Sequence, residues 1–142
     1  MKRTKKVLLV MTCFVMAFAL AFSAYAVSSW EDFSASLPSN QGDTEVSTIA
    51  LSDPSVGHMN VILYTMTNGY DSVRAWGEKS SFGHPNVSDP YDVINLQYQG
   101  INWNIYYYSS ANIGQGDNII LNLDNPINTE FRPIVTGKWT PN

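Results

Sequence analysis

Side chains that could carry out chemistry are few in this chain of 142 residues, and most stand in turn-rich stretches. The histidines are His58 and His84, and the single cysteine, Cys13, lies in an N-terminal apolar run. His84 is followed by Asp89 and Asp92 in the stretch FGHPNVSDPYD, with serines nearby, which are the residue types of a Ser-His-Asp triad. The chain contains no Gly-x-Ser-x-Gly elbow and no His-Glu-x-x-His metalloprotease motif. We therefore expect a protein that is not an enzyme.

Acidic side chains in loops suggest a second chemistry, the binding of calcium by oxygen ligands. The candidate ligands are Asp89, Asp92, Asp117 and Asp124, and asparagines stand close to the last two. The chain contains neither an EF-hand loop nor an RTX-type repeat, and Asp and Asn favour turns for backbone reasons alone. We expect no cofactor, with a structural calcium ion as the alternative.

Aromatic residues are concentrated in WNIYYYSS, residues 103–110. Because successive side chains of a strand point to opposite faces, the more apolar face, which belongs in the core, holds Trp103, Ile105 and Tyr107. Tyr106 and Tyr108 then point outward, about 7 Å apart, and Tyr98 lies on the preceding strand. Such rings stack on sugars or pack against a protein while their hydroxyls stay in water. We predict a ligand-binding surface of Tyr98, Tyr106 and Tyr108, with stabilisation of the sheet face as the alternative.

From Phe33 onward the apolar residues recur with a period of two, which indicates strands with one buried face. Trp76 and Trp139 are expected in the core. The first strand has a competitor, because Ser28-x-x-Glu31 matches a helix capping box, so a short helix over 28–37 is the alternative. Eight strands are predicted: Phe33–Leu37, Glu45–Leu51, Met59–Thr67, Tyr70–Lys79, Asp92–Gln99, Trp103–Ser109, Asn118–Leu123 and Phe131–Trp139.

The turns between these strands indicate how the strands are joined. Asn68-Gly69 suits the positive φ angles of a type I′ turn and predicts a hairpin, and Gly100 predicts a second hairpin before Trp103. Short strands without intervening helices favour antiparallel pairing. The predicted fold class is therefore all-β: an antiparallel β-sandwich of about eight strands, jelly-roll-like, with a small β-barrel as the alternative.

The N-terminus is typical of a secretory signal peptide. Four basic residues precede an apolar run from Val7 to Phe22, and Ala24-Tyr25-Ala26 provides small residues for cleavage after Ala26. The run is shorter than the roughly 20 residues that span a bilayer, so we expect no membrane anchor after cleavage. The predicted organisation is a signal peptide at 1–26 and one secreted, extracellular domain at 27–142.

The net charge of residues 27–142 limits the kinds of molecule that this segment can bind. Four basic residues against twelve acidic ones give the segment 27–142 a net charge of −8. Such a surface repels phosphate backbones and anionic headgroups, so we expect neither nucleic-acid binding nor cationic attack on membranes. The segment contains no cysteine, so no disulfide supports its fold.

The lysine-rich leader, the start Phe33…Leu37-Pro38 and the finish Gly137-x-Trp139…Pro141 resemble small exported proteins of Gram-positive bacteria, some of them labelled lactococcin-like bacteriocins. The resemblance implies a secreted β-sandwich and supplies no active site.

Together these features predict a secreted, non-catalytic protein that binds a glycan, a cell-wall polymer or a protein partner. The alternatives are a bacteriocin-like antibacterial protein and a self-assembling fibre or matrix subunit, in which residues 27–37 add to the sheet edge of a neighbour.

Overall fold

The structure, a computed structural model, describes residues 29–142 except 41, 68–71, 91–92, 96–99 and 126–129. The predicted signal peptide at 1–26 therefore lies outside the described residues. One 3-10 turn, η1 (Pro54–Val56), precedes the third strand. The strands are β1 (Glu31–Ser36), β2 (Asp43–Ala50), β3 (His58–Met66), β4 (Ser72–Lys79), β5 (Val93–Asn95), β6 (Trp103–Tyr106), β7 (Asn118–Asp124) and β8 (Ile134–Thr140).

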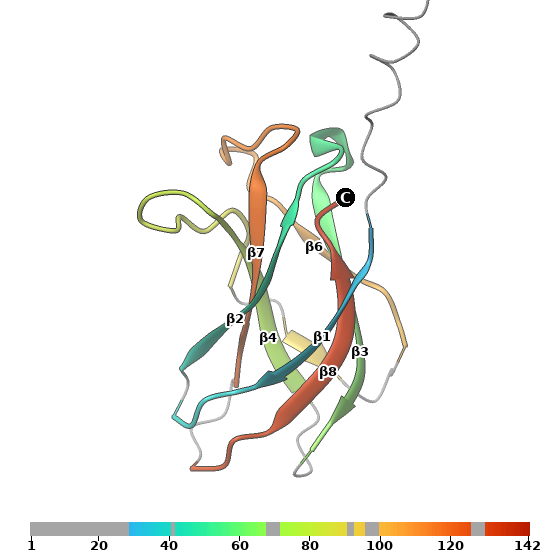
Figure 1. Ribbon diagram of the computed structural model, residues 1–142, viewed down its shortest axis with the longest axis vertical. Helices are drawn as coiled ribbons and strands as arrows, with labels where there is room; N and C mark the ends of the chain where they lie inside the picture. The colour runs from blue at the N-terminus through green and yellow to red at the C-terminus, as the bar shows by residue number, and fades with distance from the viewer. Residues whose placement is uncertain (1–28, 41, 68–71, 91–92, 96–99, 126–129) are drawn as a thin grey trace, which may run out of the picture.

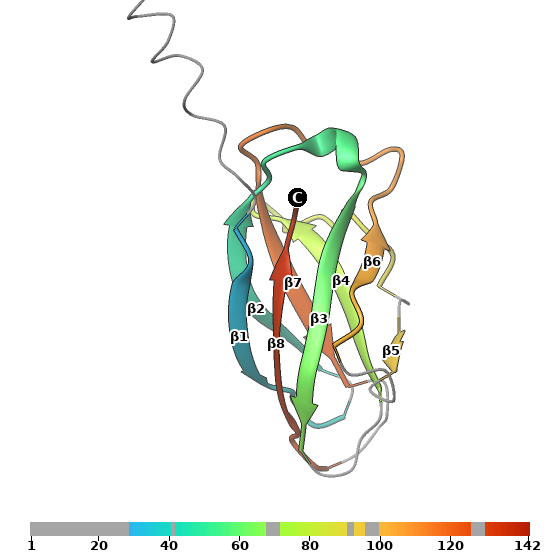
Figure 2. The ribbon, with the colours of Figure 1, turned by 90° about the vertical axis from the view of Figure 1, so that its right-hand side faces the viewer.

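These strands form two antiparallel sheets, which we name sheet A and sheet B. Sheet A has the order β1-β8-β3-β6, and sheet B has the order β2-β7-β4-β5. Figure 2 shows β1, β8 and β3 in front of β2, β7 and β4, so the sheets face each other as two layers. The pairs β1·β8, β2·β7, β3·β6 and β4·β5 are those of one long hairpin rolled over itself, which is the jelly-roll arrangement. The two sheets stay separate, so the fold is a sandwich and the barrel alternative is wrong.

The core lies between the sheets, because alternate residues of each strand point inward. Trp139 on β8 is fully buried, and its Nε1 donates a hydrogen bond of 2.7 Å to Ser47 Oγ on β2, which links the two sheets. The apolar residues whose period of two predicted the strands are the ones that fill this core. Its other buried members include Phe33, Met59, Val61, Leu63, Val73, Ala75, Ile105, Ile119, Leu121, Leu123 and Val135.

Each predicted strand overlaps an observed one, and residues 31–36 form a strand rather than the alternative helix. Both predicted hairpins, however, are wrong. Strand β3 pairs with β6 and β8 but not with β4, and β5 pairs with β4 but not with β6. Residues such as Asn68-Gly69 indicate a reversal of the chain, but in a sandwich the reversed strand can cross to the opposite sheet, where it still buries its apolar face. Among the described residues no helix has the length and hydropathy needed to cross a membrane.

Candidate functional site

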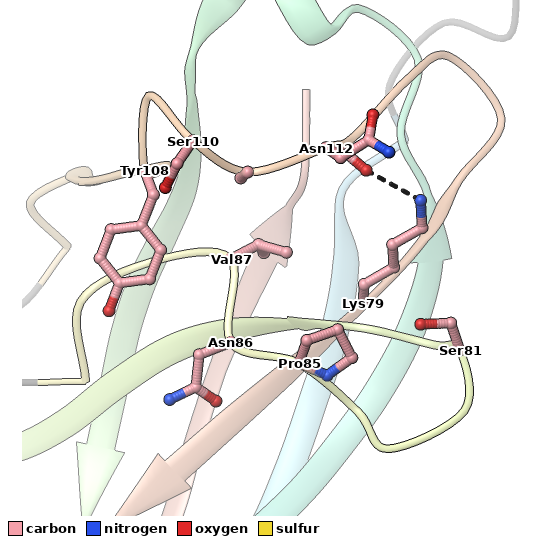
Figure 3. A pocket seen from close by; sticks show the side chains of 9 residues that line it. Lys79, Ser81, Pro85, Asn86, Val87, Tyr108, Ser110 and Asn112 are labelled. Carbon is pink, nitrogen blue, oxygen red and sulfur yellow. Dashed lines mark hydrogen bonds between the residues drawn. The ribbon is translucent and has the colours of Figure 1, made fainter.

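A pocket of about 410 Å³ opens between two loops at one end of the sandwich. One wall is the β4–β5 connection, and the other is the chain that leaves β6 (Figure 3). Tyr108, one of the three tyrosines predicted to bind a ligand, is part of this pocket. The full lining consists of Lys79, Ser81, Pro85, Asn86, Val87, Tyr108, Ser110, Ala111 and Asn112.

The first wall forms because the chain folds back on the end of β4. Lys79 N donates to Pro85 O at 3.0 Å, and Val87 N donates to Gly77 O at 2.9 Å. The reversal between them uses left-handed backbone at Gly83 (φ 84°) and His84 (φ 40°). Glycine adopts this conformation freely, whereas a histidine rarely does. The loop that results carries Ser81 and Asn86 into the pocket.

The second wall is held by main-chain hydrogen bonds on both sides of Tyr108. Tyr107 N donates to Gly57 O next to sheet A, and Tyr108 N donates to Val87 O in the β4–β5 connection. The chain thus passes from sheet A to the loop of sheet B within two residues. Tyr107 itself points inward, as predicted, and its hydroxyl donates to Pro141 O at 2.8 Å. Burial raises the pKa of the Tyr107 hydroxyl far above its usual value.

The other predicted tyrosines are placed differently. Tyr106 is 65% exposed and lies beside His58, with ring centroids 5.5 Å apart, whereas Tyr108 is 39% exposed and lines the pocket. The two rings point outward as expected, but they have different neighbours, because the chain leaves β6 after Tyr106. Tyr98 lies outside the described residues. Of the three predicted ligand-binding residues, the structure places one in a pocket.

The positively charged side chain of the pocket lining, Lys79, forms an ion pair with Asp117. Lys79 Nζ lies 2.8 Å from Asp117 Oδ2 and donates to Asn112 O at 2.9 Å, a bond drawn in Figure 3. The hydrogen bond from Lys79, followed by that from Gly114 N, lowers the pKa of the Asp117 carboxyl below its ordinary value. Asp117 therefore remains ionised near neutral pH and compensates the charge of Lys79. The pocket presents amides, hydroxyls and one aromatic ring rather than a free cation.

The four aspartates predicted as calcium ligands have separate environments. Asp117 pairs with Lys79, and Asp124 is buried 3.6 Å from Arg74 Nη1 on the outer face of sheet B. Burial raises the pKa of the Asp124 carboxyl, which Arg74 partly offsets. Asp89 is exposed, and Asp92 lies outside the described residues. Within the described part of the chain, the side chains grouped closely enough to hold a metal ion are Glu45, Glu78 and His84, none of them predicted as a ligand.

Two features of the outer face of sheet B escaped the sequence-based interpretation. His84 Nδ1 lies 3.0 Å from Glu45 Oε1, a partner 39 positions away and not an aspartate of its own loop. Trp76, expected in the core, is buried on this outer face, because Val73 and Ala75 of the same strand point inward. The alternation of β4 could have located Trp76, but no local pattern indicates the contact between Glu45 and His84.

Comparison of this chain with protein families, with curated proteins and with solved structures finds no match.

Proposed function

We propose that this protein is exported and binds an uncharged glycan, such as part of a cell-wall polymer, without catalysis, in the pocket between the β4–β5 and β6–β7 connections. The observation that carries the proposal is the convergence of Tyr108 with Asn86 and Asn112 around about 410 Å³. Small-molecule sites commonly combine an aromatic surface with a few directed polar groups in volumes of about 300–1,000 Å³. An aromatic ring covers the apolar face of a sugar, while amides and hydroxyls bond its hydroxyl groups.

Electrostatics favours an uncharged ligand over an anion. Lys79 is compensated by Asp117 at 2.8 Å, so the pocket lacks the free positive charge that would attract a phosphate or a carboxylate. The acidic surface of the chain, with a sequence pI near 4.9, works in the same direction. Export is supported by the basic and apolar N-terminus followed by Ala24-Tyr25-Ala26.

The test is a glycan array followed by a pull-down of the protein on the insoluble polysaccharide that the array selects. Tyr108→Ala should abolish retention, and Asn86→Ala should weaken it, while Tyr106→Ala is the matched control because that ring lies outside the pocket. Near-UV circular dichroism and thermal melts show whether each variant is folded. Retention of Tyr108→Ala equal to that of Tyr106→Ala would contradict the proposal, as would an array without any binding.

The antibacterial and fibre-subunit alternatives receive no specific support from the contacts of the described residues. For the fibre subunit, residues 31–36 already pair with β8 of their own chain. Strand addition to a neighbour would first have to break that pairing.

A further inference from the structure

The outer face of sheet B carries a second group of polar side chains, separate from the pocket. Arg74, Trp76 and Glu78 project from β4 on this face, since the residues between them point into the core. Glu45 on β2 belongs to the same face, because Glu45 and Trp76 both pair in register with Asn122 on β7. The β4–β5 connection reaches this face through the contact of His84 with Glu45, and Figure 1 shows that loop projecting outward to the left of β7.

Three side chains in this group can act as metal ligands. The ligand atoms of Glu45, Glu78 and His84 all lie within 4.8 Å of one another, and His84 Nδ1 is 3.0 Å from Glu45 Oε1. Metal–ligand bonds of about 2.0–2.2 Å in a tetrahedral site place ligand atoms about 3.3–3.6 Å apart. Glu45 and His84 are about half exposed, so small rotations of their side chains reach that spacing. Trp76 Nε1 donates to Glu78 Oε1 at 3.0 Å and orients the third ligand.

Asn122 provides an independent indication that this face binds something. Its side chain is fully buried, and within the described part of the chain neither its Oδ1 nor its Nδ2 has a hydrogen-bond partner. Register places it between Glu45 and Trp76, on the face that carries the three ligands. A buried amide without partners is rare and unfavourable. A water molecule or an ion beside Glu45 would satisfy it.

We propose that Glu45, Glu78 and His84 bind one divalent transition-metal ion of the zinc class, with the Asn122 amide bonded to water held by the ion. Two carboxylates balance the charge of the ion, and the imidazole nitrogen favours zinc, nickel or copper over calcium, which prefers oxygen ligands. Three protein ligands leave a coordination position for water. The metal would tie β2 to the β4–β5 connection, which also forms one wall of the pocket.

The experiment is calorimetric titration of ZnCl2 into the protein after chelator treatment, with CaCl2 titrated in parallel. We expect saturable binding of one zinc ion per chain and no saturable calcium binding. Asn122→Ala should weaken zinc binding by about tenfold, as loss of an outer partner of a metal site commonly does. His84→Ala and Glu45→Gln remove ligands and should weaken it further, and both positions are exposed enough to spare the fold.

His58→Ala is the matched control, because His58 is the other histidine and lies on sheet A beside Tyr106. That variant should bind zinc as the natural protein does, and so should Tyr108→Ala, which separates this proposal from the glycan site. Thermal unfolding in the presence of a chelator shows whether each variant is folded without metal. The proposal is overturned if zinc does not saturate, if His84→Ala binds normally, or if His58→Ala loses as much affinity as His84→Ala.

Discussion

A single ion pair determines whether the pocket carries a net charge. Lys79, the last residue of β4, ties that strand to the β6–β7 connection, because its Nζ contacts Asp117 Oδ2 and the main-chain oxygen of Asn112. The same contacts that shape the pocket remove its free cation. Tyr108 therefore remains as the largest side chain available to a ligand, which is why the glycan proposal depends on that residue.

The carboxyls of Asp117 and Asp124 should respond to acid in opposite directions. The pKa of Asp117 is lowered from 3.8 in the folded protein, chiefly by the bond from Lys79, so its contribution to stability is present above pH 3.8 and is lost as the pH falls further. The pKa of Asp124 is raised from 3.8 by burial and by Asp43, against the attraction of Arg74. As the pH falls, the Asp124 carboxyl is therefore protonated in the folded state before it is protonated in the unfolded state. The free energy of unfolding consequently rises as the pH falls towards 3.8.

We predict that the free energy of unfolding of Asp117→Asn falls less below pH 3.8 than that of the natural protein. The difference should be at most about 1 kcal/mol, because the ion pair with Lys79 lies at the surface. Asp124→Asn should instead lack the rise in the free energy of unfolding that the natural protein shows as the pH falls towards 3.8. Urea unfolding of both variants and of the natural protein, measured on either side of that pH, gives the three curves. Identical pH slopes in the two variants would contradict this assignment.

Among the elements, β8 is an interior strand of sheet A, paired with β1 on one side and β3 on the other. At Gly137 this strand comes close to both neighbours. A Cβ atom at this position would collide with the main-chain oxygen of Ile62 on β3 and would lie 2.8 Å from Cζ of Phe33 on β1. The first obstacle is backbone, so it cannot be relieved by rotating a side chain.

We predict that Gly137→Ala destabilises the domain by about 1–3 kcal/mol or more, as overpacking of a core does. Gly114→Ala is the control, since its Cβ would meet no atom closer than Asp117 Oδ2 at 3.9 Å. That control should change the free energy of unfolding by no more than about 0.5 kcal/mol. Denaturant unfolding measures both values, and equal effects of the two substitutions would show that the close approach at β8 is unimportant.

At the scale of the whole molecule, the fold depends on contacts between the C-terminal segment and segments that come far earlier in the sequence. Glu31 pairs with Trp139, and the amides of Ser52 and Asp53 donate to the main-chain oxygen of Asn142. Pairing of strands so distant in sequence requires closure of long loops before burial stabilises them. Sheet A therefore cannot be completed until the last strand is in place.

We predict that a chain ending at Arg132, and so lacking β8, does not unfold cooperatively. It would lose the strand between β1 and β3 and the buried ring of Trp139, whose removal alone typically costs about 3–5 kcal/mol. Thermal unfolding followed by near-UV circular dichroism makes the comparison with a chain that lacks only residues 1–26, the predicted signal peptide. A cooperative transition in the chain without β8 would show that β8 is dispensable.

The strands were predictable because side-chain alternation is a local property. Each observed strand overlaps a predicted one, Ile105 is buried, and Tyr106 and Tyr108 point outward as expected. The sandwich class follows from the same alternation together with turn residues between short strands. Part of the candidate site was visible too, since Tyr108 was selected for its position in an aromatic strand.

Strand partners and site neighbours, in contrast, were decided by tertiary structure. Asn68-Gly69 and Gly100 have the residue types of hairpin turns, yet the strands that follow them belong to the opposite sheet. A turn residue determines only its own backbone angles, whereas the choice of sheet depends on which arrangement buries the apolar faces of all eight strands at once. For the same reason Asn86 and Asn112 meet around Tyr108, and His84 meets Glu45, only after the two layers have come together.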